Sequence, residues 1–246
     1  MTRPGRLVLI GHPVSHSLSP HIQNAALRAA GIFTNYELLD VPPEALPGTL
    51  GALIAAGAAG NVTVPHKETV YRLCDAVSPV AERVGAVNTF RVEDGRLVGD
   101  NTDVGGFDAA VHRVFGEPRT GLRVAVLGAG GGAAAVLAAV ERWPSATTVV
   151  VSRSAPRAAA LATRFGLIAT VAENPYAAVR GADMVVNTTP VGLSDDTLPV
   201  DPHLLDPGTH VFDLAYRRGS TPWVRQARAL GLAAEDGLGM LIEQGA

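Results

Sequence analysis

The chain has 246 residues, of which 47% are hydrophobic and 17% are charged, and its formal net charge is −3. This length predicts one large domain or two small ones, and the weak charge gives no reason to expect nucleic acid or an anionic membrane as a partner. A single cysteine, Cys74, excludes an internal disulfide framework, and we expect it to pack in the core. No apolar segment approaches the ~20 residues of a membrane span or forms a signal peptide, so we expect a soluble cytoplasmic protein.

The first half of the chain alternates strand-like segments with helix-like ones. Expected strands cover residues 6–10, 34–41 and 60–65, and expected helices cover residues 19–31, 43–56 and a segment opening at His66. Ser19 is expected to be a helix N-cap because Pro20 follows it at the first helical position. Residues 78–85 predict a short capped helix, and residues 93–95 predict a β-hairpin turn. A further helix is expected from residue 106 to residue 115.

The segment after Gly121 has the pattern of a dinucleotide-binding unit. Residues 122–127 predict a buried parallel strand, and residues 133–140 predict a helix. The turn between them carries almost no side chains and consists of Gly128, Ala129, Gly130, Gly131 and Gly132. Such a turn lets the backbone approach a pyrophosphate at a helix N-terminus, although glycines also end strands for purely steric reasons.

Strands and helices continue to alternate to the end of the second half. Expected strands cover residues 147–152, 183–188 and 210–214, and expected helices cover residues 156–165 and 222–230. This alternation predicts a parallel sheet with helices on both faces. The fold class is therefore α/β, with two domains, a cleft between them and a boundary near residues 103–107.

Polar clusters follow the expected strands of the first half. They comprise residues 15–19, residues 61–67, and residues 88–89 with 101–103. Ligands of open α/β sheets collect at the carboxyl ends of strands, so these clusters are candidate binding residues. Each also has a purely structural interpretation: Ser17 suits the cap of a turn, Asp103 suits a helix start, and Lys67 suits a solvated helix residue.

Other chemistries find no support in the motifs. His12, His16 and His21 are close in sequence, but they span a proline-containing loop and a helix start without the spacing of a metal site, so we expect no metal. The chain has neither a G-x-S-x-G elbow nor a P-loop lysine motif, which leaves acyl transfer and ATP-driven chemistry without support.

Seven motifs in order resemble those of the shikimate dehydrogenase family along nearly the whole chain. They cover residues 11–20, 60–67, 85–89, 101–103, 128–131, 187–192 and 237–241 with Gln244. The resemblance implies NADP-dependent reduction of 3-dehydroshikimate to shikimate in aromatic amino-acid biosynthesis, by a monomer or homodimer. It also implies a substrate domain at residues 1–103, joined again by residues 237–246, and a Rossmann-type NADP-binding domain at residues 104–236.

The resemblance assigns roles to the polar residues. Lys67 and Asp103 would form the catalytic pair, and Ser17 and Ser19 would hold the substrate carboxylate. The remaining substrate-binding residues would be Thr63, Asn88, Tyr216 and Gln244. Ketone reduction requires a hydride on carbon and a proton on oxygen, and a cationic lysine can stabilise the charge on oxygen and deliver that proton.

The cofactor site would include the glycine turn with Thr188 and Gly237. The expected strand at residues 147–151 is followed by Ser152-Arg153-Ser154, with Arg157 three residues further on. NAD-specific proteins place a carboxylate here for the ribose 2′-hydroxyl, whereas these arginines and serines suit the 2′-phosphate of NADP. The alternative is that both arginines are solvated surface residues.

The chain departs from the family pattern at three positions: Gln23 replaces a usual histidine, Ala134 a frequent arginine and Gly132 a frequent alanine. Relatives also usually continue beyond Ala246 into a helix that packs on the substrate domain, so we expect an apolar face there to be exposed or covered by a second subunit. Two rival functions remain open: a dehydrogenase of quinate or a related polyol acid, and a catalytically idle NADP-binding paralogue.

Overall fold

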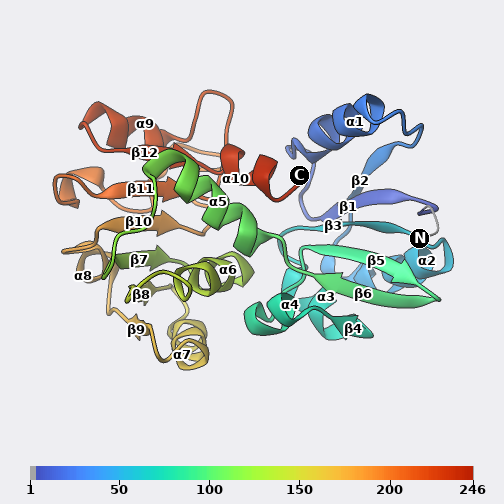
Figure 1. Ribbon diagram of the computed structural model, residues 1–246, viewed down its shortest axis with the longest axis horizontal. Helices are drawn as coiled ribbons and strands as arrows, with labels where there is room; N and C mark the ends of the chain where they lie inside the picture. The colour runs from blue at the N-terminus through green and yellow to red at the C-terminus, as the bar shows by residue number, and fades with distance from the viewer. Residues whose placement is uncertain (1–3, 246) are drawn as a thin grey trace. The chain divides into compact units, whose positions relative to one another are not determined.

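The computed structural model describes residues 4–245, which divide into two compact units (Figure 1). The first comprises residues 4–102 with Gly245, and the second comprises Asp103–Gln244. Both units have a sheet with flanking helices, so the predicted α/β class is confirmed. No helix within residues 4–245 is long and apolar enough to cross a membrane.

The described residues of the first unit form a mixed six-stranded sheet in the order β2-β1-β3-β5-β6-β4. The strands are β1 (Leu7–Gly11), β2 (Tyr36–Asp40), β3 (Ala59–Val62), β4 (Ala76–Val77), β5 (Thr89–Glu93) and β6 (Arg96–Asp100). The helices are α1 (Ser19–Ala29), the 3-10 turn η1 (Pro43–Ala45), α2 (Leu46–Ala55), α3 (Lys67–Leu73) and α4 (Pro79–Val84). Because only β5 runs antiparallel to its neighbours, the carboxyl ends of β1, β3 and β6 and the amino end of β5 share one edge.

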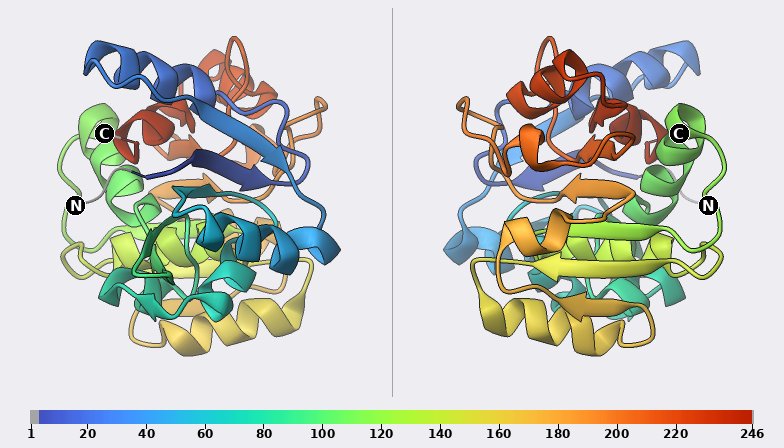
Figure 2. Two further views of the ribbon diagram at one scale, coloured as in Figure 1. Left: turned by 90° about the vertical axis from the view of Figure 1, so that its right-hand side faces the viewer. Right: turned by 90° about the vertical axis from the view of Figure 1, so that its left-hand side faces the viewer.

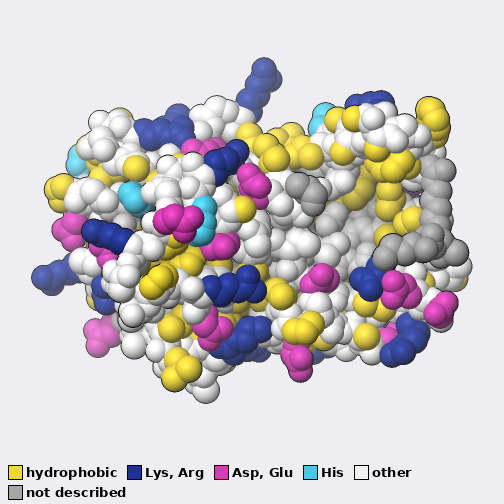
Figure 3. Space-filling view, in the orientation of Figure 1, with side chains coloured by type: hydrophobic (Ala, Val, Ile, Leu, Met, Phe, Trp, Pro, Cys, Tyr) yellow, Lys and Arg dark blue, Asp and Glu magenta, His cyan; other side chains and the backbone are white. Residues whose placement is uncertain are grey.

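The two faces of this sheet are covered unequally. The larger core cluster lies on the side of α2 and α3, includes Ile10, Leu53 and Phe90, and packs against Cys74. Burial raises the pKa of Cys74 to about 11, which suits the predicted packing role. On the other face lies α1 (Figure 2), which has no fully buried residue, all of its residues being described. Hydrophobic side chains show at the surface of this part of the unit (Figure 3). Phe33, which follows α1, is 96% exposed.

The start of α1 differs from the prediction. Ser19 is its first helical residue, and Leu18 is the N-cap, with helical backbone angles. The hydroxyl of Ser17 accepts a hydrogen bond from the Ser19 N–H at 3.2 Å. The prediction that Ser19 caps the helix is therefore wrong: because Leu18 already adopts helical angles, the amide of Ser19 falls within reach of the Ser17 side chain.

The second unit has, within the described residues, a parallel six-stranded sheet in the order β12-β11-β10-β7-β8-β9. The strands are β7 (Arg123–Leu127), β8 (Thr147–Val151), β9 (Ala169–Val171), β10 (Met184–Asn187), β11 (His210–Asp213) and β12 (Ala234–Asp236). The helices are α5 (Asp103–Phe115), α6 (Gly131–Val140), α7 (Ala155–Arg164), α8 (Pro175–Val179), the 3-10 turn η2 (Pro202–Leu204), α9 (Pro222–Ala229) and α10 (Leu238–Glu243). Read along the chain, this is the strand order of dinucleotide-binding domains, so the predicted Rossmann-type unit is confirmed.

Short elements account for most differences from the sequence-based expectation. The strands β4, β9 and β12 and the helix α8 are not predicted, because each is too short to show a periodic pattern. The helix expected from residue 106 begins at Asp103, which places a carboxylate in the first turn, where the helix dipole favours it. The resemblance implies that residues 237–246 return to the first domain. In the structure α10 packs against α5 and is part of the second unit.

Aromatic side chains pack around the buried Phe107 in the second unit. Its ring lies 6.0 Å from that of Trp143 and 5.2 Å from that of Phe212, between centroids, and it is fully buried. We predict that Phe107→Ala lowers the free energy of unfolding of this unit by about 3–5 kcal/mol, since it removes the contacts and leaves a cavity. Urea unfolding followed by tryptophan fluorescence measures this, because both tryptophans of the chain, Trp143 and Trp223, lie in this unit.

The matched control is Tyr176→Ala, which removes another aromatic side chain from the same unit at a site that is 60% exposed. It should change the free energy of unfolding by less than about 1 kcal/mol. Equal losses for the two variants would contradict the assignment of Phe107 to the core.

Candidate active site

Two loops of the first unit meet at the carboxyl edge of its sheet. The strands β1 and β3 are neighbours, and their pairing extends beyond the strand ends, because Thr63 N–H donates to Ile10 at 2.8 Å and His12 N–H donates to Val64 at 3.0 Å. Ser17 lies in the loop after β1, and Ser19 begins α1 at the end of that loop. Thr63 lies in the loop after β3, and Lys67 begins α3 at its end. The structure therefore places these four predicted site residues on adjoining loops or at the helix starts that follow them.

Lys67 is held at the start of α3 by contacts on both sides. The carbonyl of Lys67 accepts a hydrogen bond from Val87 N–H at 3.0 Å, which ties it to the segment before β5. The neighbouring His66 is buried, and its Nε2 donates to the carbonyl of Val41 at 2.6 Å. These contacts fix the backbone from which the half-buried Lys67 side chain projects.

Asn88 joins three strands at the same edge. Its backbone N–H donates a hydrogen bond to the backbone carbonyl of Asp100 at the end of β6. Its backbone carbonyl accepts one from the N–H of Val62 at the end of β3. Its buried side chain binds Thr102: the amide oxygen accepts the Thr102 N–H at 2.8 Å, and the amide nitrogen donates to the Thr102 hydroxyl at 3.0 Å. Asn88 therefore holds the residue that immediately precedes Asp103, a role that its motif does not reveal.

A partly buried chain of polar groups, which ends at the carbonyl of Asn88, involves a residue that carries no sequence signal. The hydroxyl of Tyr36 donates to the side-chain oxygen of Asn61 at 2.6 Å, and the Asn61 amide donates to the Asn88 carbonyl at 3.4 Å. The side chain of Asn24 in turn bonds both backbone groups of Tyr36. Burial raises the pKa of Tyr36, which keeps its hydroxyl a neutral donor. Tyr36 sits in an ordinary strand pattern, so sequence reasoning misses it.

The remaining predicted substrate-site residues belong to the second unit. Asp103 is the buried first residue of α5. One helical turn further on, Gly106 lies directly against Gln244, since a Cβ added to it would be 2.7 Å from the Gln244 Cβ. Tyr216 lies three residues after β11 and is half-buried. Gln244 thus packs on α5 one helical turn beyond Asp103, and Tyr216 follows a strand of the same unit.

The glycine turn after β7 is packed closely against the end of β10. Gly128 has φ +122°, and a Cβ there would lie 2.3 Å from the hydroxyl oxygen of Thr188. That hydroxyl donates to the carbonyl of Leu127 at 2.8 Å, which joins the ends of β7 and β10 where the strand order reverses. Helix α6 begins at Gly131, and no side chain among the described residues caps it. Its first N–H groups can therefore donate hydrogen bonds to an anion.

The segment after β8 lies against this turn. Gly128 N–H donates to Val151 at 2.8 Å, and Ser154 N–H donates to the Ser152 hydroxyl at 3.2 Å. A Cβ added to Gly130 would lie 4.0 Å from a guanidinium nitrogen of Arg157, so this arginine reaches the glycine turn. The exposed Arg153 lies on the same short segment.

The other predicted cofactor residues occupy the same end of the sheet. Gly131 and Gly132 form the first turn of α6, with Ala129 preceding them, and Gly237 follows β12. Gly237 N–H donates to the carbonyl of Ala215 at 3.0 Å, which joins the loops after β11 and β12. Ala134 is 3% exposed within the wall of α6. Among the described residues no group of three or more His, Cys, Asp or Glu side chains forms a metal site.

A buried carboxylate that sequence reasoning misses lies at the end of β11. Asp213 accepts hydrogen bonds from the Asn187 amide at 2.9 Å, the Thr221 hydroxyl at 2.8 Å and the Ala215 N–H at 3.1 Å. Burial raises the pKa of Asp213 to about 6, and the carboxylate of Asp236 on the adjacent strand contributes. No motif marks Asp213, because its three partners come together only in the folded sheet.

This pKa makes the stability of the second unit pH-dependent. An exposed carboxyl group has a pKa of 3.8, so between about pH 4 and pH 6 the folded chain binds a proton that the unfolded chain does not. We predict that wild-type stability, relative to that of Asp213→Asn, rises by up to about 3 kcal/mol as the pH falls through this window. Urea unfolding followed by tryptophan fluorescence measures it. A difference that stays constant from about pH 4 to about pH 8 would contradict the prediction.

Comparison with known proteins identifies relatives of nearly the whole chain. Residues 9–90 match the family described as the shikimate dehydrogenase substrate binding domain. The shikimate dehydrogenase (NADP(+)) of Rubrobacter xylanophilus is 46% identical over 246 residues, covering 96% of this chain and 86% of the relative.

Solved structures of the same family are similar to the chain in fold as well as in sequence. The shikimate 5-dehydrogenase of Thermus thermophilus, in complex with NADP(H) and shikimate, is 42% identical, with a TM-score of 0.86 over 98% of this chain and 90% of its own. The shikimate dehydrogenase of Aquifex aeolicus is 34% identical, with a TM-score of 0.89 over 100% of this chain and 91% of its own. The resemblance found in the motifs is confirmed, and the chain belongs to the shikimate dehydrogenase family.

Proposed function

We propose that the chain catalyses the reversible, NADP-dependent reduction of 3-dehydroshikimate to shikimate. The observation that carries the proposal is its similarity, over 98% of the chain, to a dehydrogenase crystallised with NADP(H) and shikimate. The proposed catalytic residues Lys67 and Asp103 are both present in the sequence, which favours an active enzyme over a catalytically idle paralogue. When bound, NADP supplies or accepts the hydride. The chain's own residues bind and orient the substrate and transfer the proton.

The residues at the carboxyl end of the second sheet suit NADP. The first N–H groups of α6 and the glycine turn would hold the pyrophosphate, with Thr188 and Gly237 beside it. Ser152, Arg153, Ser154 and Arg157 would hold the 2′-phosphate. Because Arg157 already reaches the turn and no carboxylate lies between residues 152 and 157, this segment favours a phosphate over a free hydroxyl.

The substrate would be held mainly by uncharged groups. The hydroxyls of Ser17 and Ser19 would orient its carboxylate without neutralising it, and Thr63, Asn88, Tyr216 and Gln244 would complete the site. The Ser17 hydroxyl already bonds Ser19, so the two side chains share one location. Such a set selects a ring that carries hydroxyl groups, because unpaired buried polar groups would penalise an apolar substrate.

Lys67 is proposed as the proton donor to the ketone oxygen, with Asp103 as its carboxylate partner. Lys67 is the only lysine among the 20 lysine and arginine residues of the chain. An arginine is never deprotonated in a protein, whereas an ammonium group can both stabilise charge on oxygen and give up a proton. The chain thus carries its one lysine at the position where the reaction needs a transferable proton.

The direct test of the function is an NADP+-coupled assay of shikimate oxidation on the purified chain, with quinate assayed in parallel. We expect turnover with shikimate and a kcat/KM for quinate that is lower. Equal or higher efficiency with quinate would favour a dehydrogenase of related polyol acids. NADP+ binding without turnover of either compound would favour the idle paralogue and refute the proposal.

For the lysine, we predict that Lys67→Ala lowers kcat by about 10²–10⁴-fold, because both charge stabilisation and proton delivery are lost. Lys67→Arg restores the charge but not the transferable proton, so its kcat should remain far below wild type. The control is Arg72→Ala on the exposed face of the same helix, which should leave kcat unchanged. A Lys67→Ala variant with near-normal kcat would refute the assignment. Because the chain has one lysine, labelling with ¹⁵N-lysine gives a single side-chain NMR signal that reports its protonation directly.

For the cofactor, we predict that kcat/KM favours NADPH over NADH by at least about tenfold, since one good arginine contact to a 2′-phosphate contributes about 1.5 kcal/mol at an exposed site. Arg153→Ala should narrow this gap chiefly through KM for NADPH. Arg164→Ala, at the opposite end of α7, removes the same charge away from the glycine turn and should leave the gap intact. A wild-type preference for NADH, or equal efficiency with both cofactors, would show that the segment binds no 2′-phosphate.

A further inference from the structure

Two long loops of the second unit begin at neighbouring strands. The loop after β10 starts with Thr188, a proposed cofactor residue, and the loop after β11 carries Tyr216, a proposed substrate residue. Since β10 and β11 are paired in parallel, both loops leave the sheet at its carboxyl edge. The separation of Thr188 and Tyr216 therefore depends on what connects these loops.

At their base the loops are connected through buried side chains. Asn187 and Asp213 are register partners at the ends of β10 and β11, and the Asn187 amide donates to the Asp213 carboxylate at 2.9 Å. The oxygen of the Asn187 amide accepts the Thr189 N–H at 3.0 Å. Asp213 also accepts the Ala215 N–H, one residue before Tyr216. The first residues of both loops are thus held by one buried amide–carboxylate pair.

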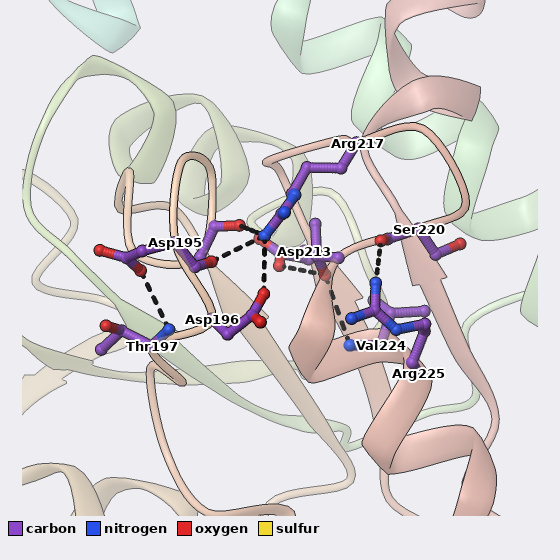
Figure 4. A network of polar contacts seen from close by, with 10 residues as sticks. Asp195, Asp196, Thr197, Asp213, Arg217, Ser220, Val224 and Arg225 are labelled. Carbon is purple, nitrogen blue, oxygen red and sulfur yellow. Dashed lines mark hydrogen bonds and ion pairs between the residues drawn. The ribbon is translucent and has the colours of Figure 1, made fainter.

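Further out, the side chain of Arg217 connects the two loops (Figure 4). A single guanidinium nitrogen, Nη1, donates to the carbonyls of Gly192 at 3.4 Å and Asp195 at 2.7 Å and to the Asp196 carboxylate at 3.1 Å. Hydrogen bonds from Thr197 lower the pKa of the Asp195 carboxyl and shape the tip of the loop that Arg217 holds. Arg217 directly follows Tyr216 in the chain.

We propose that Arg217 is a positioning residue: it clasps the loop after β10 to the loop after β11 and so keeps Tyr216 at a set distance from Thr188. This inference rests on the proposed function for its kinetic consequence, but not for the clasp itself. Reaction rates are sensitive to placement, and a shift of about 1 Å in a reacting group can cost a factor of about 10². The buried base would still hold Thr188 when the clasp is removed.

The expected kinetic effect follows because Arg217 and the Asn187–Asp213 pair restrain different parts of the two loops. Arg217→Ala should lower kcat for shikimate oxidation by about tenfold, by loosening the segment that carries Tyr216. The dissociation constant for NADP+, measured by calorimetry without substrate, should change by less than about threefold, because the Asn187–Asp213 pair still holds the start of the loop that carries Thr188. Since the contacts converge on one nitrogen, the single ammonium of Arg217→Lys can replace it and should restore most of kcat.

Arg225→Ala is the matched control, because Arg225 lies on α9 and donates to the carbonyl of Ser220, within the loop after β11 (Figure 4). This variant removes the same charge, but from a side chain whose contact does not connect the two loops. Its kcat should therefore stay near that of wild type. Hydrogen–deuterium exchange gives a readout that does not depend on activity. Arg217→Ala should speed exchange in both residues 192–197 and residues 214–221, whereas Arg225→Ala should not affect residues 192–197.

The outcomes separate this inference from the proposed function. If wild type does not oxidise shikimate, the proposed function fails, and exchange alone decides whether Arg217 joins the loops. If wild type is active but Arg217→Ala matches Arg225→Ala in both kcat and exchange, the clasp is refuted. Faster exchange with unchanged kcat would likewise overturn the positioning role.

Discussion

Parallel pairing of β7 with β10 is the constraint on which the second unit depends. Each crossover returns the chain to the same edge of the sheet, so residues distant in sequence meet where the strands end. Thr188 reaches the carbonyl of Leu127, 61 residues away, and only a residue without a side chain leaves room for it at position 128. The same register places Asn187 beside Asp213 as a hydrogen-bond donor and Asp236 beside it as a second carboxylate. Burial, with the charge of Asp236, raises the pKa of Asp213.

In the first unit Asn88 connects the ends of several strands, as the paired strand ends do in the second unit. It lies where the one antiparallel strand begins, so its backbone bonds the ends of the strands on either side. Its side chain then fixes Thr102, and chain continuity passes that restraint to Asp103. The proposed catalytic carboxylate is therefore restrained both through the residue before it and by its own helix. A residue that resembles a substrate ligand in sequence also has a structural task.

The distribution of cations separates two kinds of chemistry. Arginine stands where we propose that a fixed charge holds a phosphate or a loop: Arg153 and Arg157 in the segment after β8, and Arg217 between two loops. The single lysine stands at Lys67, where the proposed reaction requires a proton to leave. Guanidinium groups suit planar or multiple acceptors and keep their charge, whereas an ammonium group can change protonation state. The choice of cation at each position thus follows from its task.

The sequence by itself determined the longer helices and strands, the glycine turn after β7 and the residue types of the candidate active site. These depend on local patterns: an apolar strand before Gly128, glycines in the turn, and polar residues after each strand. It did not reveal β9 or β12, which are stabilised by pairing with neighbours and not by a pattern of their own. The cap of α1 was misplaced for a similar reason, since the backbone angles of Leu18 moved the helix start and left Ser17 to bond its first amide. Only the tertiary structure brought Asp213 to Asn187, Tyr36 to Asn61 and Arg217 to Asp195, because each pair depends on strand register or loop packing between segments that are far apart in sequence.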